Sequence, residues 1–285
     1  MERLAKYFLS GVMLALLVLG CTGSGSPISD SNKKHLSEKL YEENFSAGHL
    51  GPRQGTPEAM TLLDSILELD STNAAAWREI SIPYLKRGMP LQWKPFFDKA
   101  VYHDAKTWQP WRGYLYLWFF RDYEKAIADF NASDTLTDYI DHPQGHSVDF
   151  WRGIAYLGLK DYENSLSYWD KHIQKETEES GEDWVELEAF LYRGIAYYES
   201  GNPEKALENF DKVIKYFKQS ADAKYYKALI LKQKGETQKS LSLVKEAKED
   251  FNAGYFNNRD YVETLRQIYL EDLLHLEEEL LAVKK

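Results

Sequence analysis

The stretch that decides the fold is residues 192–210, which read YRGIAYYESGNPEKALENF. Apolar side chains recur on both sides of Gly201 at the spacing of amphipathic helices. Gly201 can adopt a positive φ and end the first helix. Asn202 and Pro203 are typical of the cap and the first turn of the helix that follows. The stretch therefore predicts two helices joined by a tight turn.

The second helix of this unit recurs along most of the chain as a small residue followed, four positions later, by a bulky one. Two such residues share one face of a helix, so the small one lets paired helices approach and the bulky one packs against the next helix. The pairs are Ala59/Leu63, Ala126/Phe130, Ser165/Trp169, Ala206/Phe210 and Ser240/Val244, with the bulkier Trp93/Phe97 in the second place.

Successive pairs are 34, 33, 39, 41 and 34 residues apart. The two longest intervals contain polar stretches, residues 134–147 and 175–183, which we interpret as longer turns or extended helix ends. Proline is scarce and β-branched alternation is missing, so a sheet is not expected.

These registers resemble the tetratricopeptide repeat, a helix pair with a period of 34 residues. First helices with the matching pattern contain Trp111-Arg112-Gly113, Trp151-Arg152-Gly153 and Tyr192-Arg193-Gly194. The resemblance implies an all-α solenoid of about five to six helix pairs over residues 36–254. We expect a C-terminal capping region over residues 255–285, with its helix at about Arg259 to Ala282.

Proteins of this family bind partners in a concave groove lined by the first helices. Most of the matching positions here are apolar or aromatic, which suits an extended peptide or a partner helix. The third repeat is one residue out of step with the others. Carried over by register, the expected groove residues are Arg78, Ile82, Tyr114, Trp118, Phe150, Ile154, Leu191, Ile195, Tyr198 and Tyr225.

Residues 108–120 contain seven aromatic side chains. At 3.6 residues per turn these cannot all lie on one side of a helix. We expect most of them to pack into both neighbouring repeats, and the rest to contribute to a hydrophobic binding surface.

The N-terminus has the parts of an export signal. A positive start is followed by an apolar stretch over residues 8–19, which is shorter than a membrane-spanning helix. Val18-Leu19-Gly20-Cys21 then resembles the lipobox of bacterial lipoproteins, a family in which the signal is cleaved before the cysteine and its thiol is lipidated. We expect a signal peptide over residues 1–20; a plain signal peptide or an uncleaved anchor is the alternative.

The residues after the expected cleavage site are rich in Gly, Ser, Pro, Asp and Asn, the composition of a flexible linker. We expect a lipid on Cys21 and a tether over residues 21–35 that holds the chain to the cell envelope. Thr22 after the cysteine resembles outer-membrane sorting, and the acidic cluster of surface-displayed lipoproteins is absent. The predicted location is therefore the periplasmic face of the outer membrane.

Composition and motifs favour binding over chemistry. The net charge of −10 and the lack of a basic block argue against nucleic acid. Cys21 is the only cysteine, which excludes an intramolecular disulfide and a thiolate metal cluster. The sequence contains no nucleophile elbow, Walker loop or H-E-x-x-H motif. We therefore expect a protein-binding scaffold that is not an enzyme and has no cofactor and no metal.

Two alternatives to a general scaffold remain open. One is an adaptor lipoprotein for outer-membrane protein assembly or for envelope hydrolases. The other, of a different class, is a carbohydrate-binding, metal-binding or hydrolytic envelope protein. Nitrogen and carboxylate ligands for a divalent ion are close together in one loop, although the same residues could simply cap helices. They are His142, His146, Asp134, Asp138, Asp141 and Asp149.

Overall fold

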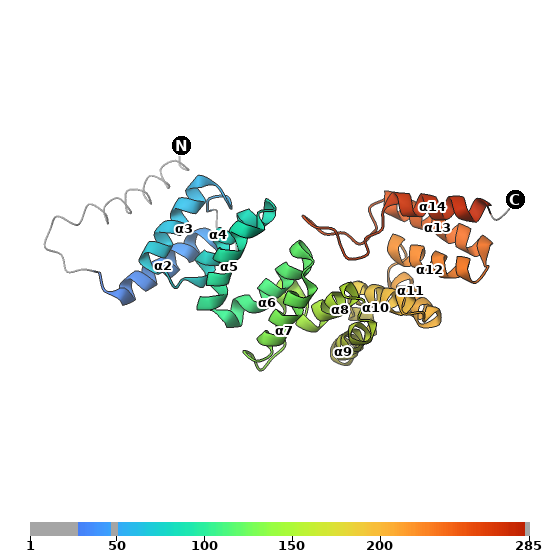
Figure 1. The fold of residues 1–285 in the computed structure, drawn as a ribbon, viewed down its shortest axis with the longest axis horizontal. Helices are drawn as coiled ribbons and strands as arrows, with labels where there is room; N and C mark the ends of the chain where they lie inside the picture. The colour runs from blue at the N-terminus through green and yellow to red at the C-terminus, as the bar shows by residue number, and fades with distance from the viewer. Residues whose placement is uncertain (1–27, 47–50, 283–285) are drawn as a thin grey trace. The chain divides into compact units, whose positions relative to one another are not determined.

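The computed structural model describes residues 28–46 and 51–282. These residues form thirteen α-helices, α2 to α14, with short π and 3-10 turns and no named strand (Figure 1). The chain divides into two compact units, residues 1–82 and 83–285. None of the described helices combines the length and the apolar character needed to cross a membrane.

The first unit contains α2 (Asp30–Phe45), α3 (Pro57–Leu69) and most of α4 (Ala74–Lys86). α2 packs on α3, where the Ser37 hydroxyl donates a hydrogen bond of 3.1 Å to the Ile66 carbonyl. The predicted tether over residues 21–35 is wrong in its second half, because α2 begins at Asp30 and is capped by the Ser29 hydroxyl. Cys21 and the expected signal peptide lie outside the described residues.

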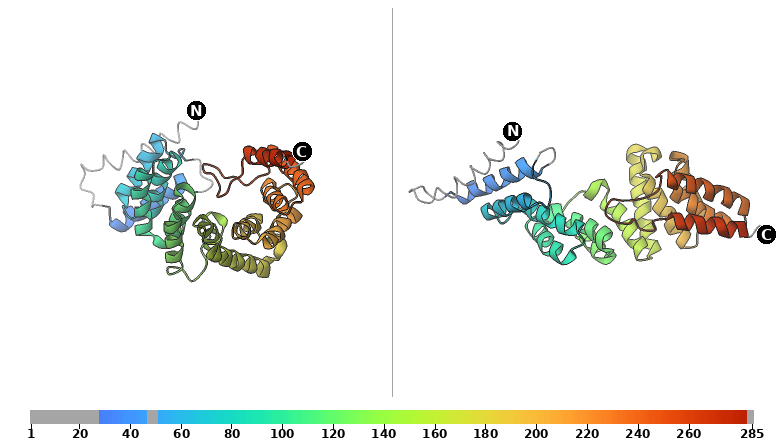
Figure 2. Two further views of the ribbon diagram at one scale, coloured as in Figure 1. Left: turned by 45° about the vertical axis from the view of Figure 1, so that its right-hand side comes forward. Right: turned by 90° about the horizontal axis from the view of Figure 1, so that it is seen from above.

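The helices of the second unit pack against one another in chain order (Figure 2). Four helix pairs with short connections follow α5. The pairs are α6/α7, α8/α9, α10/α11 and α12/α13, and α14 follows them. The elements of the unit are α5 (Pro90–His103), α6 (Ala105–Leu115), η2 (Tyr116–Phe120), α7 (Tyr123–Ser133), η3 (Pro143–Gly145), α8 (Val148–Gly158), α9 (Tyr162–Ser180), η4 (Glu182–Trp184), α10 (Leu187–Glu199), α11 (Pro203–Tyr216), α12 (Ala221–Gln233), α13 (Thr237–Asn252) and α14 (Leu270–Ala282). The alternation confirms the predicted all-α solenoid, and α9 has the extended end that the long interval predicted.

Three of the four helix pairs are closed at a glycine of the first helix, and α12 of the fourth pair has Ala228 at the matching place. The bulky residue predicted from the second helix lies directly over this glycine, and an added Cβ would come within 2.5–2.7 Å of its ring. Such a distance is far below van der Waals contact, so only hydrogen fits. The glycine and aromatic pairs are Gly113/Phe130, Gly153/Trp169 and Gly194/Phe210. The small residues four positions earlier, Ala126, Ser165 and Ala206, are fully buried.

An extra residue in the third repeat is accommodated by a π-helical turn. Gly113 precedes the helix cap Asp122 by nine residues, whereas Gly153 precedes Asp161 by eight. The first helix widens into η2 at Tyr116–Phe120, and the Arg121 amide donates to the Tyr116 carbonyl five residues earlier. This turn explains why the third repeat is out of step, since a π turn contains one residue more than an α turn.

An arginine next to two of these glycines links three helices. Arg112 on α6 pairs with Asp98 on α5 at 2.8 Å and with Asp129 on α7 at 2.7 Å. Arg193 on α10 repeats the arrangement with Asp170 on α9 and with Asn209 on α11, at 2.8 Å each. Arg112 therefore fastens its repeat to α5, and Arg193 fastens its repeat to α9.

The predicted C-terminal helix is wrong over nearly its first half, residues 259–269. α13 ends at Asn252 and α14 begins only at Leu270. Residues 254–269, which we call the strap, are not helical, and Tyr261 and Arg266 have positive φ angles of 69° and 58°. Figure 1 shows the strap as a red-brown loop that leaves α13 and α14 and extends toward the green helices of the same unit.

Replacing Gly153 with alanine tests the closure of the helix pairs. We expect the free energy of unfolding to fall, because overpacking a core costs about 1–3 kcal/mol and the Trp169 ring is fully buried and cannot move aside. Urea unfolding followed by tryptophan fluorescence measures the change. Ser167→Ala, on the exposed side of α9, is the control and should leave stability unchanged. Equal stability of the Gly153→Ala variant and the wild type would contradict the packing account.

Candidate functional site

The strap lies against the first helices of the four repeats in the second unit. We call the surface that it covers the first-helix face. Its members come from α6 and η2, from α8, from α10 and from α12, so the strap crosses every repeat from Ala105 onward. They are Tyr114, Trp118, Arg121, Trp151, Glu188, Tyr192, Glu199, Asp222 and Tyr226.

Arg259 anchors the strap in an aromatic cage. Its guanidinium carbon lies 4.7 Å from the centroid of the Trp118 ring and 5.1 Å from that of Trp151. The two indoles are nearly perpendicular, with centroids 6.1 Å apart. A carboxylate oxygen of Glu188 lies 3.3 Å from the Nη2 atom of Arg259. Desolvated cation–π contacts of this kind stabilise a guanidinium by about 2 kcal/mol, and the carboxylate adds charge pairing.

Arg266 anchors the other end of the strap. Its Nε and Nη2 atoms donate to the two carboxylate oxygens of Glu199 at 2.5 and 2.9 Å, a bidentate pair. Hydrogen bonding to Glu199 raises the pKa of Arg266 above its usual range. Glu199 is eleven residues after Glu188 on α10, which places both carboxylates on one side of that helix three turns apart.

Between these anchors and α13, the strap is bound through its backbone. The Asn257 amide donates to a carboxylate oxygen of Asp222 at 2.7 Å, and the Ala221 amide at the start of α12 donates to the Tyr255 carbonyl at 3.0 Å. The Asn257 side chain donates to the Tyr192 hydroxyl at 3.0 Å. Burial raises the pKa of Asp222 to about 7, although the Asn257 amide opposes the shift. Main-chain bonds of this kind recognise extended chain of many sequences.

An open pocket of about 330 Å³ remains beside the first part of the strap. Its walls are apolar side chains of α10 and α11, the start of α12, and strap residues. Lining residues include Leu187, Leu191, Val213, Phe217, Asp222 and Phe256. The strap therefore leaves part of the space between these helices unfilled.

The predicted groove residues fall into three groups in the structure. Tyr114 and Trp118 lie beside Arg259, and Leu191 lines the open pocket, so these three are in contact with or next to the strap. Tyr198 and Tyr225 flank Tyr226, with ring centroids 5.8 and 5.4 Å from it. These five residues therefore lie beside the strap or beside a member of the first-helix face.

The remaining predicted groove residues are fully buried or lie in the first unit. Phe150, Ile154 and Ile195 are at most 1% exposed. The Phe150 ring packs between helices against Trp169, at a centroid distance of 5.0 Å. Arg78 and Ile82 belong to the first unit, where Arg78 pairs with Glu79 and Ile82 is buried.

Sequence reasoning missed the polar residues that bind the strap. Glu188, Glu199 and Asp222 have no fixed place in the apolar pattern of the repeat, and Arg259 and Arg266 follow the last repeat. A signal was present in the spacing of the two carboxylates on α10. This spacing could be interpreted only with knowledge that the strap lies against that side of α10.

The aromatic run over residues 108–120 packs in two directions, as predicted. Trp108 meets Phe97, and Tyr116 and Phe120 both meet Trp93, on α5. Tyr114 and Trp118 meet Trp151 on α8, at centroid distances of 5.1 and 6.1 Å. The run therefore joins the repeats on either side, and its α8 side forms the wall of the arginine cage.

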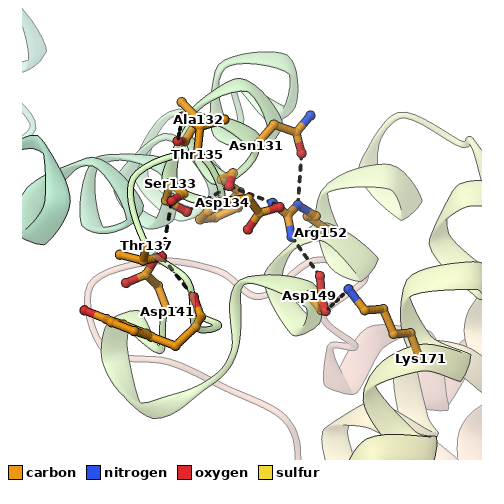
Figure 3. Close-up of polar contacts among 12 residues, drawn as sticks. Asn131, Ala132, Ser133, Asp134, Thr135, Thr137, Asp141, Asp149, Arg152 and Lys171 are labelled. Atoms are coloured by element: carbon orange, nitrogen blue, oxygen red, sulfur yellow. Dashed lines mark hydrogen bonds and ion pairs between the residues drawn. The ribbon is translucent and has the colours of Figure 1, made fainter.

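Asp134 and Asp149, two of the four aspartates of the 134–149 loop, are paired with cations of the chain. Figure 3 shows Arg152 at the centre of this group, where it donates to Asp134 at 2.5 Å and to Asp149 at 2.7 Å. Lys171 holds the second oxygen of Asp149 at 2.7 Å, and Thr137 donates to Asp141 at 3.0 Å. Over residues 28–46 and 51–282, no group of three or more His, Cys, Asp or Glu side chains is arranged to hold a metal ion.

A serine, a histidine and a carboxylate form a hydrogen-bonded chain near this loop. Ser147 Oγ lies 3.1 Å from His172 Nδ1, and His172 Nε2 lies 2.9 Å from Glu186. Burial opposes ionisation of Glu186, but hydrogen bonds from His146 and His172 outweigh it and lower the pKa of the carboxyl. Ser147 is buried and caps α8 by accepting the Phe150 amide. The Ser147 hydroxyl therefore has a structural role. The series of hydrogen bonds connects the loop before α8 with the loop before α10.

Asp222→Asn tests the burial of this carboxyl under the strap. Between pH 4 and 7 the folded wild type keeps a proton on Asp222 that the unfolded chain has released, since burial raises the pKa from 3.8 to about 7. Raising the pH therefore favours unfolding of the wild type over this range. We expect its free energy of unfolding to fall relative to the variant, measured by urea titration at several pH values. Parallel curves for wild type and Asp222→Asn would contradict it, and Asp64→Asn, at an exposed site, is the control.

Comparisons with known proteins agree with this architecture. Residues 191–254 match the family model described as tetratricopeptide repeat. A search of curated proteins gave no match. The solved structure of PilW, described as a widely conserved type IV pilus biogenesis factor, is 14% identical, with a TM-score of 0.57 over 87% of this chain and 100% of that chain.

Two further structures have similar helix arrays. MamA from Desulfovibrio magneticus RS-1 is 16% identical, with a TM-score of 0.52 over 63% of this chain and 96% of its own. YrrB, described as a TPR protein with an unusual peptide-binding site, is 17% identical, with a TM-score of 0.51 over 76% and 97%. At these identities the likeness concerns the fold alone. Residues 191–254 thus match the tetratricopeptide repeat itself, and helix pairs of the same kind precede them in the second unit.

Proposed function

We propose that this protein is a non-enzymatic scaffold that holds an extended segment of another protein on its first-helix face. The observation that carries the proposal is the strap itself. This face already holds sixteen residues of non-helical chain through ion pairs, aromatic contacts and backbone hydrogen bonds. A surface with these groups has the chemistry for holding extended polypeptide, whichever chain supplies it.

The electrostatics of the face narrow the partner to a segment with positive side chains. Glu188 and Glu199 supply its carboxylates, and the Trp118 and Trp151 rings attract cations. A catalytic role is not favoured. The Ser147 hydroxyl, in the one arrangement that resembles a nucleophile with its base, is engaged as a helix cap and buried.

Charge reversal on the first-helix face tests the scaffold function. In Glu188→Lys, the new ammonium would repel a positive side chain of the partner, so proteins captured by the wild type from the producing cells should be lost. Quantitative mass spectrometry of captured proteins provides the measurement. Glu178→Lys introduces the same charge change on an exposed position of α9 and should retain the partners. If both variants capture the wild-type set, binding at this face is excluded.

The lipid anchor belongs to the same proposal. The lipobox resemblance around Cys21 supports attachment to the periplasmic face of the outer membrane, where a scaffold would act on envelope proteins. A thioether-linked diacylglycerol and an amide-linked chain together hold a protein stably on a membrane.

Replacing Cys21 with serine tests the anchor directly. We expect the wild type to incorporate labelled palmitate and to sediment with membranes, and the Cys21→Ser protein to do neither. Fractionation of cells with immunoblotting measures the distribution. Thr22→Ser, one position later, should behave as the wild type does. Membrane sedimentation and label that persist in Cys21→Ser would exclude lipidation at this residue.

A further inference from the structure

The docked strap leaves some polar groups without hydrogen bonds and some apolar surface uncovered. Around Arg259, three buried N–H groups have no hydrogen-bond partner among the described residues: Nε1 of Trp118, Nη1 of Arg121 and Nε of Arg259 itself. A buried N–H group without a partner destabilises the state that leaves it so. The open pocket beside Leu187 and Phe217 adds unfilled apolar surface. A different segment could therefore fit the same face better than the strap does.

The aromatic cage around Arg259 contacts the arginine side chain, and its known contacts do not involve the backbone of that residue. Trp118 and Trp151 contact the guanidinium of Arg259 through their ring faces, and Glu188 contacts it through one oxygen. The strap backbone is bound four and five residues later by a different side chain, since Arg121 donates to the Glu263 and Thr264 carbonyls. Any chain that places an arginine here would make the same side-chain contacts.

The strap is held mainly at a few points. Leu265 and Ile268 are its buried apolar side chains, whereas Tyr261 is 69% exposed. It joins α13 at Gly254, whose φ of 88° suits a glycine at a helix end. Segments with few buried apolar contacts and no regular hydrogen-bond ladder open at low free-energy cost.

We propose that the cage of Trp118, Trp151 and Glu188 is an arginine-recognition subsite, which Arg259 fills as an internal ligand until an extended partner segment replaces the strap. That segment carries one arginine for this cage and a second positive side chain for Glu199. The inference rests on the proposed scaffold function and specifies the chemistry of its partner. It also means that the strap competes with the partner.

The competition has a measurable size. A tethered segment is present at an effective concentration of about 1 mM, so an untethered competitor with the same contacts binds weakly while the strap is docked. Weakening the strap removes this penalty. The apparent affinity of the competitor then rises in proportion to the fraction of molecules whose first-helix face is open.

A peptide with the sequence of residues 254–269, labelled with fluorescein, is the probe. Its binding to the full chain is followed by fluorescence anisotropy. In the chain with Arg259→Ala and Arg266→Ala, the internal strap is weakened, and we expect the peptide to bind at least about tenfold more tightly than to wild type. Lys218→Ala with Lys245→Ala removes the same charge from exposed positions of the second unit and should bind the peptide as wild type does.

Two further arms identify the subsite. A peptide carrying Arg259→Ala should lose at least about tenfold in affinity for the strap-weakened chain. Adding Glu188→Gln to that chain should weaken the native peptide and leave the substituted peptide unchanged. Hydrogen exchange over residues 254–269 reports whether the strap opens, and we expect faster exchange in the strap-weakened chain than in wild type.

The proposal is overturned by any of three results. In the first, the strap exchanges faster in the weakened chain, yet the native peptide does not bind or binds no better than the substituted one. In the second, the strap keeps wild-type protection without its two arginines. In the third, the wild type forms a dimer that Arg259→Ala dissociates, which assigns the cage to the strap of a second copy. None of these arms uses a cellular partner, so they fail or succeed independently of the capture experiment with Glu188→Lys.

Discussion

The structure depends on the side of each first helix that its own second helix leaves uncovered. On α8, Gly153 meets Trp169 of the paired helix, while Trp151, two residues earlier, is fully buried by other neighbours. A helix pair cannot bury both sides of its first helix by itself, which is why repeats of this kind stack. Stacking covers part of the second side, and the strap covers what remains of it near Trp118 and Trp151.

The strap covers this surface differently from a helix. A packed helix would contribute mainly apolar contacts, whereas the strap contributes two arginines, an asparagine and main-chain groups. The consequence for energetics is a small number of strong, directional contacts separated by exposed residues. Such an interface is specific and also easy to open, which suits a surface that exchanges one segment for another.

Much of the fold could be predicted from the sequence, because repeated close approach imposes repeated residue types. Gly194, Ala206 and Phe210 are required together wherever two helices meet in this way, and their spacing recurs without knowledge of the rest of the chain. The extra residue before Asp122 broke this register visibly. Its cause, the π-helical turn at Tyr116–Phe120, required the coordinates.

The strap could not be predicted, for a related reason. Tyr261, Leu265 and Ile268 have the spacing of one helix face, so periodicity favoured a helix from about Arg259. The positive φ angles at Tyr261 and Arg266 and the ion pair with Glu199 are produced by tertiary contacts with helices more than fifty residues away in sequence. Local pattern does not contain that information.

The groove positions show the same limit at single residues. Register placed Phe150 and Trp118 in equivalent classes, but one ring lies between helices against Trp169 and the other walls the arginine cage. A first helix has neighbours on several sides, and a small rotation decides which neighbour a side chain meets. Sequence spacing specifies the helix face only to within about one residue, or 100°.

Docking of the strap is the central claim, and electron paramagnetic resonance tests it most directly. Spin labels are attached at Tyr261 on the strap and at Glu163, an exposed residue of α9, in a chain with Cys21 replaced by serine. The account predicts one narrow distribution of distances between the two labels, as expected for a strap held at both arginines. A broad distribution, unchanged when Arg259 and Arg266 are both replaced by alanine, would contradict it.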